Sequence, residues 1–344
     1  MNKMYCLIGE SNMYKRKMLL LFCLILNILM FLPSCNNFSD DKTADPSDSP
    51  EPVDVFEKDN IKVQSVPQSS KLVFGSKLLE DVELDPDDYA KGELVLINYE
   101  HPVPALYEHS PMVTLYSIRQ KGLFVMKDSE ISMKKVATDT INDMFNAATQ
   151  AGMRKYNIYS AYRTPEYQQK LLDDAVAKLV NKGNTEEEAL QTALLTIASP
   201  GNSEHHSGLS MDVGIIDENG VQLNGEAITG TPESTWLQNN SYKYGFIIRY
   251  PLEKSDITKI SYEPWHLRYV GYHHAIAIFG MDQCFEEYID YIASKGCISV
   301  AMDGKEYCRI FYYPKDTKSI KVPVGFRHEI IGTGDGYAVT VYVE

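Results

Sequence analysis

The first 60 residues limit what this chain can fold into, because their composition cannot build a packed domain. Basic residues at 15–17 precede an almost unbroken apolar run from Met18 to Leu32, and Pro33 and Ser34 then lead to Cys35. The run is shorter than the roughly 20 residues that a membrane span needs, and this arrangement is typical of a secretory signal peptide. We therefore predict a signal peptide over 1–35 and a folded part outside the cytoplasm.

Cys35 stands where a bacterial lipobox places its cysteine, directly after the apolar run. In such a motif the thiol is diacylated, and the cysteine becomes the new N-terminus after cleavage. We predict lipidation of Cys35 and attachment of the protein to the lipid membrane through this anchor. An ordinary signal peptide and an uncleaved anchor are the alternatives.

Residues 36–60 contain eight acidic side chains and two lysines but few apolar residues. Such a segment cannot bury enough apolar surface to fold by itself. We expect it to be a disordered acidic tether between the anchor and the folded part.

The charge balance of the whole chain excludes one class of partner. The formal net charge is −14 and the pI is near 5.1. A protein that binds phosphate backbones needs a positive face, so no nucleic-acid partner is expected.

Hydrophobic periodicity and capping residues predict an α+β fold with a mostly antiparallel sheet and flanking helices. Apolar residues at three- and four-residue spacing predict a helix over 133–153, and Thr164-Pro165 and Thr185 each mark a helix start. The other expected elements are strands at 94–97, 156–162, 210–216, 244–250 and 265–270, helices from Pro232 and over 272–294, and β-hairpins after Cys297. We place the main domain at 61–296 and a C-terminal β-hairpin extension at 297–344.

Three cysteines, Cys284, Cys297 and Cys308, follow the signal segment and Cys35. A two-residue turn at Asp303-Gly304 would set Cys308 opposite Ser299, so Cys297 would be only a diagonal neighbour, which is poor disulfide geometry. We expect packed thiols, with a bridge from Cys284 left open.

The stretch from Ser203 to Val213 contains a histidine and an aspartate seven residues apart, His205 and Asp212, the second inside an apolar strand. His266, in the later stretch from Tyr262 to Val270, can complete a set of three ligands. Three protein ligands with an open fourth position for water are the arrangement of catalytic zinc.

Glu263 lies three residues before the third predicted ligand, and Pro264 lies between them. Zinc lowers the pKa of a bound water to about 7, and a nearby carboxylate can take up the water proton. Because proline breaks strand alternation, Glu263 need not point away from His266. We therefore predict Glu263 as the general base.

The pattern S-x-H-x-x-G-x-[AS]-x-D, followed by E-x-W-H, resembles the VanY-type zinc D,D-carboxypeptidases, which are related in fold to D-Ala-D-Ala dipeptidases and the Hedgehog signalling domain. The resemblance covers about residues 90–280 and departs at Ser210, where alanine is usual. It implies Zn²⁺ at His205, Asp212 and His266 with Glu263 as base. It also implies a role in trimming peptidoglycan stem peptides. Together with the predicted lipid anchor at Cys35, this leads us to expect the enzyme on the membrane that faces the cell wall.

The same family has an arginine and a glutamine upstream, in a segment like Ser160 to Gln168. Arg163 is expected to pair with a carboxylate or a developing oxyanion through its planar fork, with a structural ion pair as the alternative. The other predicted substrate contacts are Gln168, Ser203, Tyr250 and Trp265.

Two alternative functions are left, and a third is excluded. An L,D-carboxypeptidase would use the same metal residues on tetrapeptide stems, and a non-catalytic module would bind peptidoglycan without hydrolysis. A serine-type enzyme needs a K-T-G element after S-x-x-K, and no such element follows Ser39 or Ser132. We therefore predict that the protein is a zinc D-alanyl-D-alanine carboxypeptidase.

Overall fold

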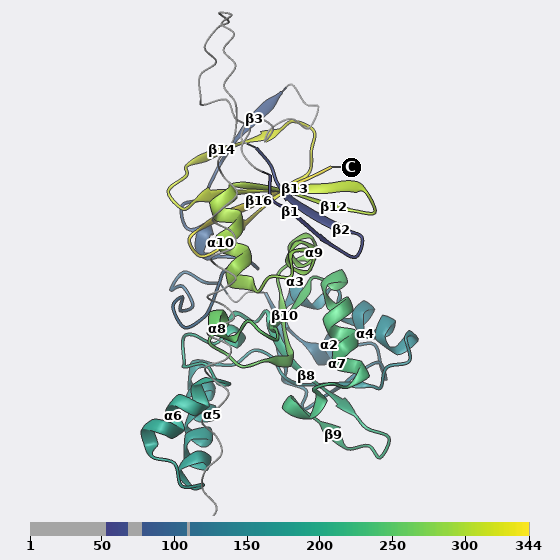
Figure 1. Ribbon diagram of the computed structural model, residues 1–344, viewed down its shortest axis with the longest axis vertical. Coiled ribbons are helices and arrows are strands. Elements are labelled where there is room, and N and C mark those ends of the chain that lie inside the picture. The colour runs from purple at the N-terminus through teal and green to yellow at the C-terminus, as the bar shows by residue number, and fades with distance from the viewer. Residues whose placement is uncertain (1–52, 68–77, 109–110, 344) are drawn as a thin grey trace, which may run out of the picture. The chain divides into compact units, whose positions relative to one another are not determined.

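Two six-stranded sheets and two two-stranded ribbons organise the computed structural model (Figure 1), which describes residues 53–67, 78–108 and 111–343. The predicted signal peptide, Cys35 and most of the predicted tether lie outside the described residues. The strands are β1 (Val55–Lys58), β2 (Ile61–Ser65), β3 (Leu79–Glu83), β4 (Met112–Thr114), β5 (Val125–Met126), β6 (Ser132–Lys134), β7 (Tyr156–Ser160), β8 (Ser210–Ile216), β9 (Gln222–Leu223), β10 (Phe246–Tyr250), β11 (Glu263–Tyr269), β12 (Cys297–Met302), β13 (Lys305–Pro314), β14 (Ser319–Pro323), β15 (His328–Gly332) and β16 (Gly336–Tyr342).

Helices connect these strands. They are α2 (Leu115–Ile118), α3 (Lys135–Thr138), α4 (Ile141–Gln150), α5 (Pro165–Val180), α6 (Glu186–Leu194), α7 (Pro232–Asn240), α8 (Ser255–Thr258), α9 (Tyr272–Met281) and α10 (Phe285–Lys295), with 3₁₀ turns η3 (Asp88–Ala90), η4 (Glu204–Ser207), η5 (Gly225–Ile228) and η6 (Ser241–Tyr244). Within the described ranges, none is both long enough and apolar enough to cross a membrane.

The first sheet has the order β10-β11-β8-β7-β5, with β9 beside β8. Its pairs are antiparallel except for β5 and β7, so the predicted α+β class with a mostly antiparallel sheet is confirmed. β8 lies near the centre, and its first six residues are buried, which suits a strand covered on both faces. Phe145 of α4 packs into the same core as Tyr156 of β7 and Met211 of β8.

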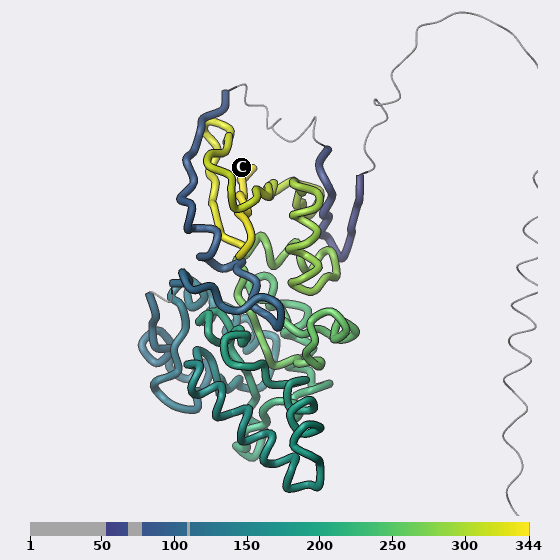
Figure 2. Tube along the Cα trace, turned by 90° about the vertical axis from the view of Figure 1, so that its left-hand side faces the viewer, coloured from purple at the N-terminus to yellow at the C-terminus, as the bar shows by residue number. Residues whose placement is uncertain are grey.

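The second sheet joins the two ends of the chain, in the order β1-β2-β12-β13-β16-β15. β2 pairs with β12 over five residue positions, and in Figure 2 the purple N-terminal strands run beside the yellow-green C-terminal region. Apolar residues of β2, β12, β13, α9 and α10 share one core. The segment 297–344 is therefore not a separate extension, and a tether predicted to reach residue 60 would have to end before β1.

Several predicted elements differ from the observed ones for identifiable reasons. Residues 94–97 are buried but form no strand, because the Arg268 guanidinium takes the backbone carbonyl groups of Glu93 and Val95, each at 2.9 Å. The helix expected over 133–153 begins only after β6 and is divided into α3 and α4. The helix expected over 272–294 is broken at Asp282, which has a left-handed φ of 55°.

Cys297 and Cys308 of the second sheet are buried thiols, and so is Cys284. The observed register places Cys308 opposite Val300, not opposite Ser299, because a bulge interrupts the hairpin between Val300 and Ala301. A bulge adds one residue to one strand and shifts every later pair. The predicted packed thiols are confirmed, and their predicted register is wrong by one residue.

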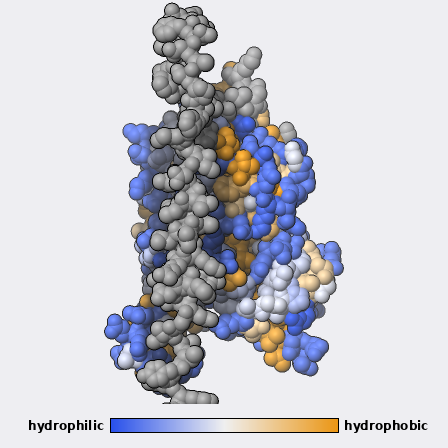
Figure 3. All heavy atoms as spheres, viewed as in Figure 1, coloured by the Kyte–Doolittle hydropathy of each residue, from blue (hydrophilic) through white to orange (hydrophobic). Residues whose placement is uncertain are grey.

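The face of the molecule in Figure 3 is mostly hydrophilic where grey atoms do not cover it, with small orange areas between. Exposed large apolar side chains such as Tyr116 and Leu252 are scattered among different elements. Such scattered apolar residues are normal for a protein surface and indicate no function by themselves.

An ion pair between a partly exposed arginine and a buried carboxylate joins α7 to the segment before β7. Arg154 donates from Nε and Nη2 to the two carboxylate oxygens of Glu233, at 3.0 and 2.8 Å, and Glu233 is 3% exposed. The hydrogen bonds from Arg154 hold the pKa of Glu233 at about 2, below its usual value of 4.5. A lowered carboxylate pKa stabilises the fold above pH 4.5, and this contribution is lost as the pH falls toward 2.

We therefore expect Glu233→Gln to lower the free energy of unfolding at pH 7 by about 2 kcal/mol. The difference from the wild type should shrink at pH 3, where part of the native contribution is already lost. Urea denaturation at both pH values measures this. An equal loss at both would show that the charge of Glu233 does not contribute.

Candidate active site

Two neighbouring strands and a 3₁₀ turn bring the predicted metal ligands together. Asp212 of β8 and His266 of β11 are directly paired across the two strands. His205 comes from η4, which precedes β8, and its backbone carbonyl accepts a hydrogen bond from the Arg163 amide at 3.3 Å. One donor atom from each of the three residues lies within 4.8 Å of the other two, and all three residues are buried.

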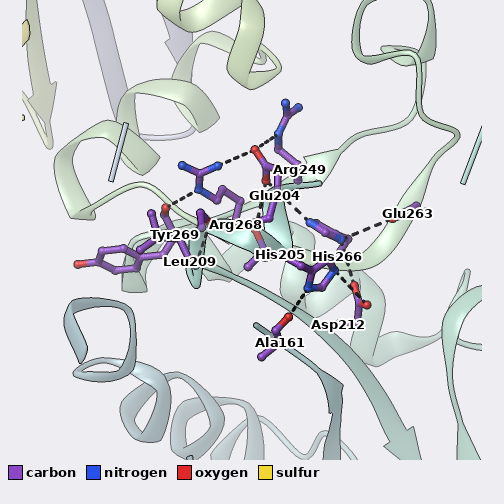
Figure 4. Close-up of polar contacts among 12 residues, drawn as sticks. Ala161, Glu204, His205, Leu209, Asp212, Arg249, Glu263, His266, Arg268 and Tyr269 are labelled. Carbon is purple, nitrogen blue, oxygen red and sulfur yellow. Dashed lines mark hydrogen bonds and ion pairs between the residues drawn. The ribbon is translucent and has the colours of Figure 1, made fainter. Parts of the chain in front are cut away.

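The contacts of each ring show which of its nitrogens faces the centre of this group. His205 Nδ1 lies 2.6 Å from the Ala161 carbonyl oxygen, which leaves Nε2 facing Asp212 Oδ2 at 3.3 Å (Figure 4). His266 faces the same carboxylate with Nδ1, 3.0 Å from Oδ1. The two rings meet edge to face, with centroids 4.8 Å apart. Nε2 of His205, Nδ1 of His266 and the Asp212 carboxylate are therefore the available donors.

The donor set fits a zinc ion. Asp212 Oδ1 is a buried oxygen that makes no hydrogen bond with any of the described residues, although His266 Nδ1 is close to it. A buried polar atom without a partner is costly unless an ion or water satisfies it. Two imidazole nitrogens and one carboxylate oxygen are ligands that zinc takes in catalytic sites.

The protonation states of His205 and Asp212 suit metal binding, whereas that of His266 does not. Burial lowers the pKa of His205 to about 4, which keeps this ring neutral near pH 7. Burial opposes ionisation of Asp212, but His205 and Arg163 outweigh it and hold the pKa of Asp212 well below its usual range. Burial also lowers the pKa of His266, but contacts with Asp212 and Glu204 prevail and raise it to about 9. A metal ion would have to displace this proton.

Glu263 lies on the same side of β11 as His266, and its Oε2 is 3.7 Å from His266 Nδ1. Strict alternation would place residues three apart on opposite faces. Alternation is broken here because the pairing of β11 with β10 is irregular. The register shifts between Ile248 and Tyr250, opposite the segment of β11 that contains Pro264. Burial raises the pKa of the Glu263 carboxyl to about 8, which is suitable for proton transfer near neutral pH.

Arg163 follows β7 and reaches into the same group. Its Nη2 donates to Asp212 Oδ2, its Nε donates to Ser160 Oγ at 2.7 Å, and its Nη1 donates to Gln168 Oε1 at 3.4 Å. Gln168 is also tied to the Ala198 carbonyl oxygen, at 2.8 Å. The predicted arginine and glutamine therefore lie at the site, where they also make structural contacts.

A cavity of about 270 Å³ opens over these residues. The other predicted contacts, Ser203, Tyr250 and Trp265, all line it, and the Tyr250 ring centroid is 4.9 Å from that of His266. Tyr159, Leu171 and Ile260 also line it and were not predicted. Tyr159 lies in a strand of alternating apolar residues, so its sequence position indicated only a core residue.

Glu204 is a further residue that sequence reasoning missed. It is 1% exposed, and its Oε1 accepts hydrogen bonds from Arg249 Nε at 2.7 Å and Arg268 Nη1 at 2.6 Å. Its Oε2 lies 3.8 Å from His266 Nε2. The sequence signal that could have pointed to Glu204 is the presence of Arg249 and Arg268 inside two apolar strands. A charged residue is rarely buried unless it is paired, so each arginine required a buried acidic partner.

Two further buried histidines, His206 and His274, do not belong to the donor group. His206 Nδ1 is 2.7 Å from the Arg163 carbonyl oxygen, and His274 on α9 lies between Tyr288 and Thr340. Neither is among the three residues whose donor atoms converge.

Comparison with known proteins gives consistent relatives. A family model described as VanY, D-alanyl-D-alanine carboxypeptidase, matches residues 130–272. A D-alanyl-D-alanine carboxypeptidase of Enterococcus faecium is 34% identical over 299 residues, which cover 84% of this chain and 89% of that protein.

One solved structure shows a similar fold, and another is related in sequence over a shorter range. The vancomycin-resistance D,D-dipeptidase VanXYg, in complex with a D-Ala-D-Ala phosphinate analogue, has a TM-score of 0.62 and 25% identity, over 77% of this chain and 99% of its own. A mutant of the D,D-pentapeptidase VanY from a VanB-type resistance cassette, in complex with Zn(II), has a TM-score of 0.49 and 35% identity, over 57% of this chain and 98% of its own.

Proposed function

Because this chain is a carboxypeptidase of the VanY D-alanyl-D-alanine carboxypeptidase family, we propose that it removes the terminal D-Ala of peptidoglycan stem peptides with a zinc ion held by His205, Asp212 and His266. One observation supports this most strongly: three buried donors converge at the base of a cavity in which Glu263 faces the same point. Catalytic zinc sites have this plan of three protein ligands and one open position.

When bound, zinc supplies Lewis acidity, which polarises the scissile carbonyl and makes water a stronger acid. Glu263 is the base in this proposal. It accepts the proton of the attacking water and then gives it to the leaving amine of D-Ala. Its burial favours this role, because a carboxyl group with a raised pKa binds and releases a proton near neutral pH.

The remaining cavity residues orient the substrate in this proposal. Arg163 can stabilise a developing negative charge, since its guanidinium presents several N–H groups in one plane. Ser203 and Gln168 offer polar groups to the peptide, and Trp265 and Tyr250 form apolar walls. The cavity is large enough for a short peptide end, as its volume of about 270 Å³ indicates.

The location of the enzyme is also a proposal. The apolar run from Met18 to Leu32, with Cys35 shortly after it, supports export and lipid anchoring to the membrane that faces the cell wall. An acidic segment after Cys35 would then give the enzyme reach into the wall.

Mass spectrometry of synthetic stem peptides tests the proposed reaction. Purified protein is incubated with a pentapeptide ending in D-Ala-D-Ala and with the corresponding tetrapeptide, each with and without a chelator. We expect loss of one D-Ala from the pentapeptide, abolished by the chelator and restored by zinc. Preferred cleavage of the tetrapeptide would instead identify an L,D-carboxypeptidase, and binding without cleavage would identify a peptidoglycan-binding module.

Arg163→Ala is expected to lower kcat/KM by about 10²-fold, the usual effect of losing one donor to a developing oxyanion. Steady-state kinetics with the pentapeptide measures this. Because Arg163 also bonds Asp212, the zinc content of the variant is measured in parallel. Unchanged kinetics would leave Arg163 with the role of a structural ion pair only.

A further inference from the structure

Four buried charged side chains lie next to the proposed metal ligand His266. They form one charge cluster, which consists of Glu204, Arg249, Arg268 and Glu286. Arg249 and Arg268 are fully buried, and both donate to Glu204 Oε1. Arg249 also donates to both carboxylate oxygens of Glu286, at 2.9 and 2.6 Å. Two carboxylates balance two guanidinium groups, so this charge cluster can be buried without a net charge.

The two oxygens of Glu204 have different partners. Oε1 is held by the two arginines, whereas Oε2 accepts a hydrogen bond from Ser210 Oγ at 3.2 Å and faces His266 Nε2 at 3.8 Å. Figure 4 shows Glu204 between the arginines and the His266 ring, on the side of the ring away from Asp212. The arginines therefore fix a carboxylate that aims one oxygen at the nitrogen of His266 that is not offered to the metal.

This geometry is what a ligating imidazole needs. A histidine that binds a metal through one nitrogen usually donates its other N–H to a carboxylate or carbonyl group, which fixes the tautomer and the ring orientation. In His205 the Ala161 carbonyl group occupies this position, at 2.6 Å from Nδ1. In His266 the corresponding nitrogen has no hydrogen bond within the described part of the chain, and Glu204 Oε2 is its nearby carboxylate.

The charge cluster also reaches outside the part of the chain that the family model matches. Glu286 belongs to α10, beyond residue 272, where the match ends. It accepts a further hydrogen bond from Asn98 Nδ2 at 3.0 Å, and Arg268 is held by the backbone of residues 93 and 95. α10 packs into the core of the second sheet. The position of His266, which lies in the first sheet, thus depends on a helix that packs on the second sheet.

We propose that Glu204 is a positioning residue for His266, and that Glu286 on α10 holds Glu204 in place through Arg249. This inference rests on the proposed zinc site. It assigns a role in metal binding to the charge cluster and to α10.

The test is the zinc dissociation constant of the purified full-length protein, measured by competition with a chromophoric chelator, for the wild type and for Glu204→Gln. Glutamine keeps the size of the side chain but removes the charge that favours the N–H of His266. We expect zinc to bind about 10- to 100-fold more weakly, the usual effect of losing such a partner. The visible spectrum of the cobalt-substituted variant should also change, because the ring is no longer held.

Two further variants separate positioning from folding. Glu204→Asp keeps the charge balance but withdraws the carboxylate from His266, so the protein should fold and bind zinc at least about threefold more weakly, a part of the full effect. Glu286→Gln touches no metal ligand and should weaken zinc binding by a similar factor. Glu233→Gln is the matched control, since it removes an equally buried carboxylate from an arginine pair away from the site, and its zinc affinity should equal that of the wild type.

The outcomes are distinct. Wild-type protein that fails to bind zinc would overturn the proposed function itself, and this inference with it. Wild-type protein that binds zinc, together with folded Glu204→Gln or Glu204→Asp protein whose affinity is within twofold of it, would overturn only the positioning role. Normal zinc affinity in Glu286→Gln would remove α10 from the proposal.

Discussion

Replacing Glu263 by glutamine is expected to lower kcat by about 10³-fold, within the range that general acid–base groups contribute. Glutamine has nearly the same shape but cannot accept the proton of the attacking water. Because Glu263 is not one of the three converging donors, zinc should stay bound at one ion per protein. Steady-state hydrolysis of the pentapeptide and metal analysis of the same sample measure both quantities.

A control for this variant is already in the cavity. Trp265 lines the same space but has no acid–base chemistry, so Trp265→Phe should change KM more than kcat. Turnover by Glu263→Gln within tenfold of the wild type would remove Glu263 as the base. Loss of zinc from this variant would instead indicate that Glu263 acts as a metal ligand.

His266→Ala should lose both zinc and turnover. The three donors lie within 4.8 Å of one another, and removing one leaves a histidine and an aspartate, too few for a zinc site of this type. We expect activity below about 10⁻³ of the wild type, since both the metal and the chemistry that depends on it are absent. Metal analysis after dialysis and the pentapeptide assay check the two parts of this expectation.

His206→Gln is the matched control for the loss of a buried histidine near the site. His206 adjoins the ligand His205 in sequence, but its Nδ1 contacts the Arg163 carbonyl oxygen. This variant should keep its zinc. Full zinc binding by His266→Ala would show that the ion lies elsewhere, and equal zinc loss from both variants would point to a general loss of structure.

The residues that converge at the candidate site could be singled out because each lies in a short, recognisable stretch of sequence. His205 and Asp212 lie seven residues apart on a turn and the strand that follows it, so their distance is set by a short stretch of chain. His266 was predicted as the residue that could complete the set of three, and its cross-strand pairing with Asp212 is what brings it to the same point. The helix starts at Thr164 and Thr185 were also predictable, since each hydroxyl accepts the hydrogen bond of its own first turn.

Long-range pairings were not predictable in the same way. The segment 94–97 has the composition of a strand, but Arg268 takes its neighbouring carbonyl groups and no sheet forms. The bulge beside Val300 adds one residue to one strand and so shifts the partner of Cys308 by one position. This could not be predicted, because an extra residue leaves no mark in a pattern of alternating side chains. The sheet that unites β1 and β2 with β12 joins residues more than 200 positions apart.

The amino-acid sequence alone determined the fold class, the helix starts and the identity of the predicted ligands, because these depend on periodicity, capping and spacing within short stretches. Only the tertiary structure decided that Glu204, Arg249, Arg268 and Glu286 form one buried cluster behind His266. Glu204 and Glu286 are ordinary in their own segments, and only the two arginines stand out locally, because each lies inside an apolar strand. Their shared position arises from the packing of η4, β10, β11 and α10, and a charge can be buried there only because the opposite charges arrive from other parts of the chain.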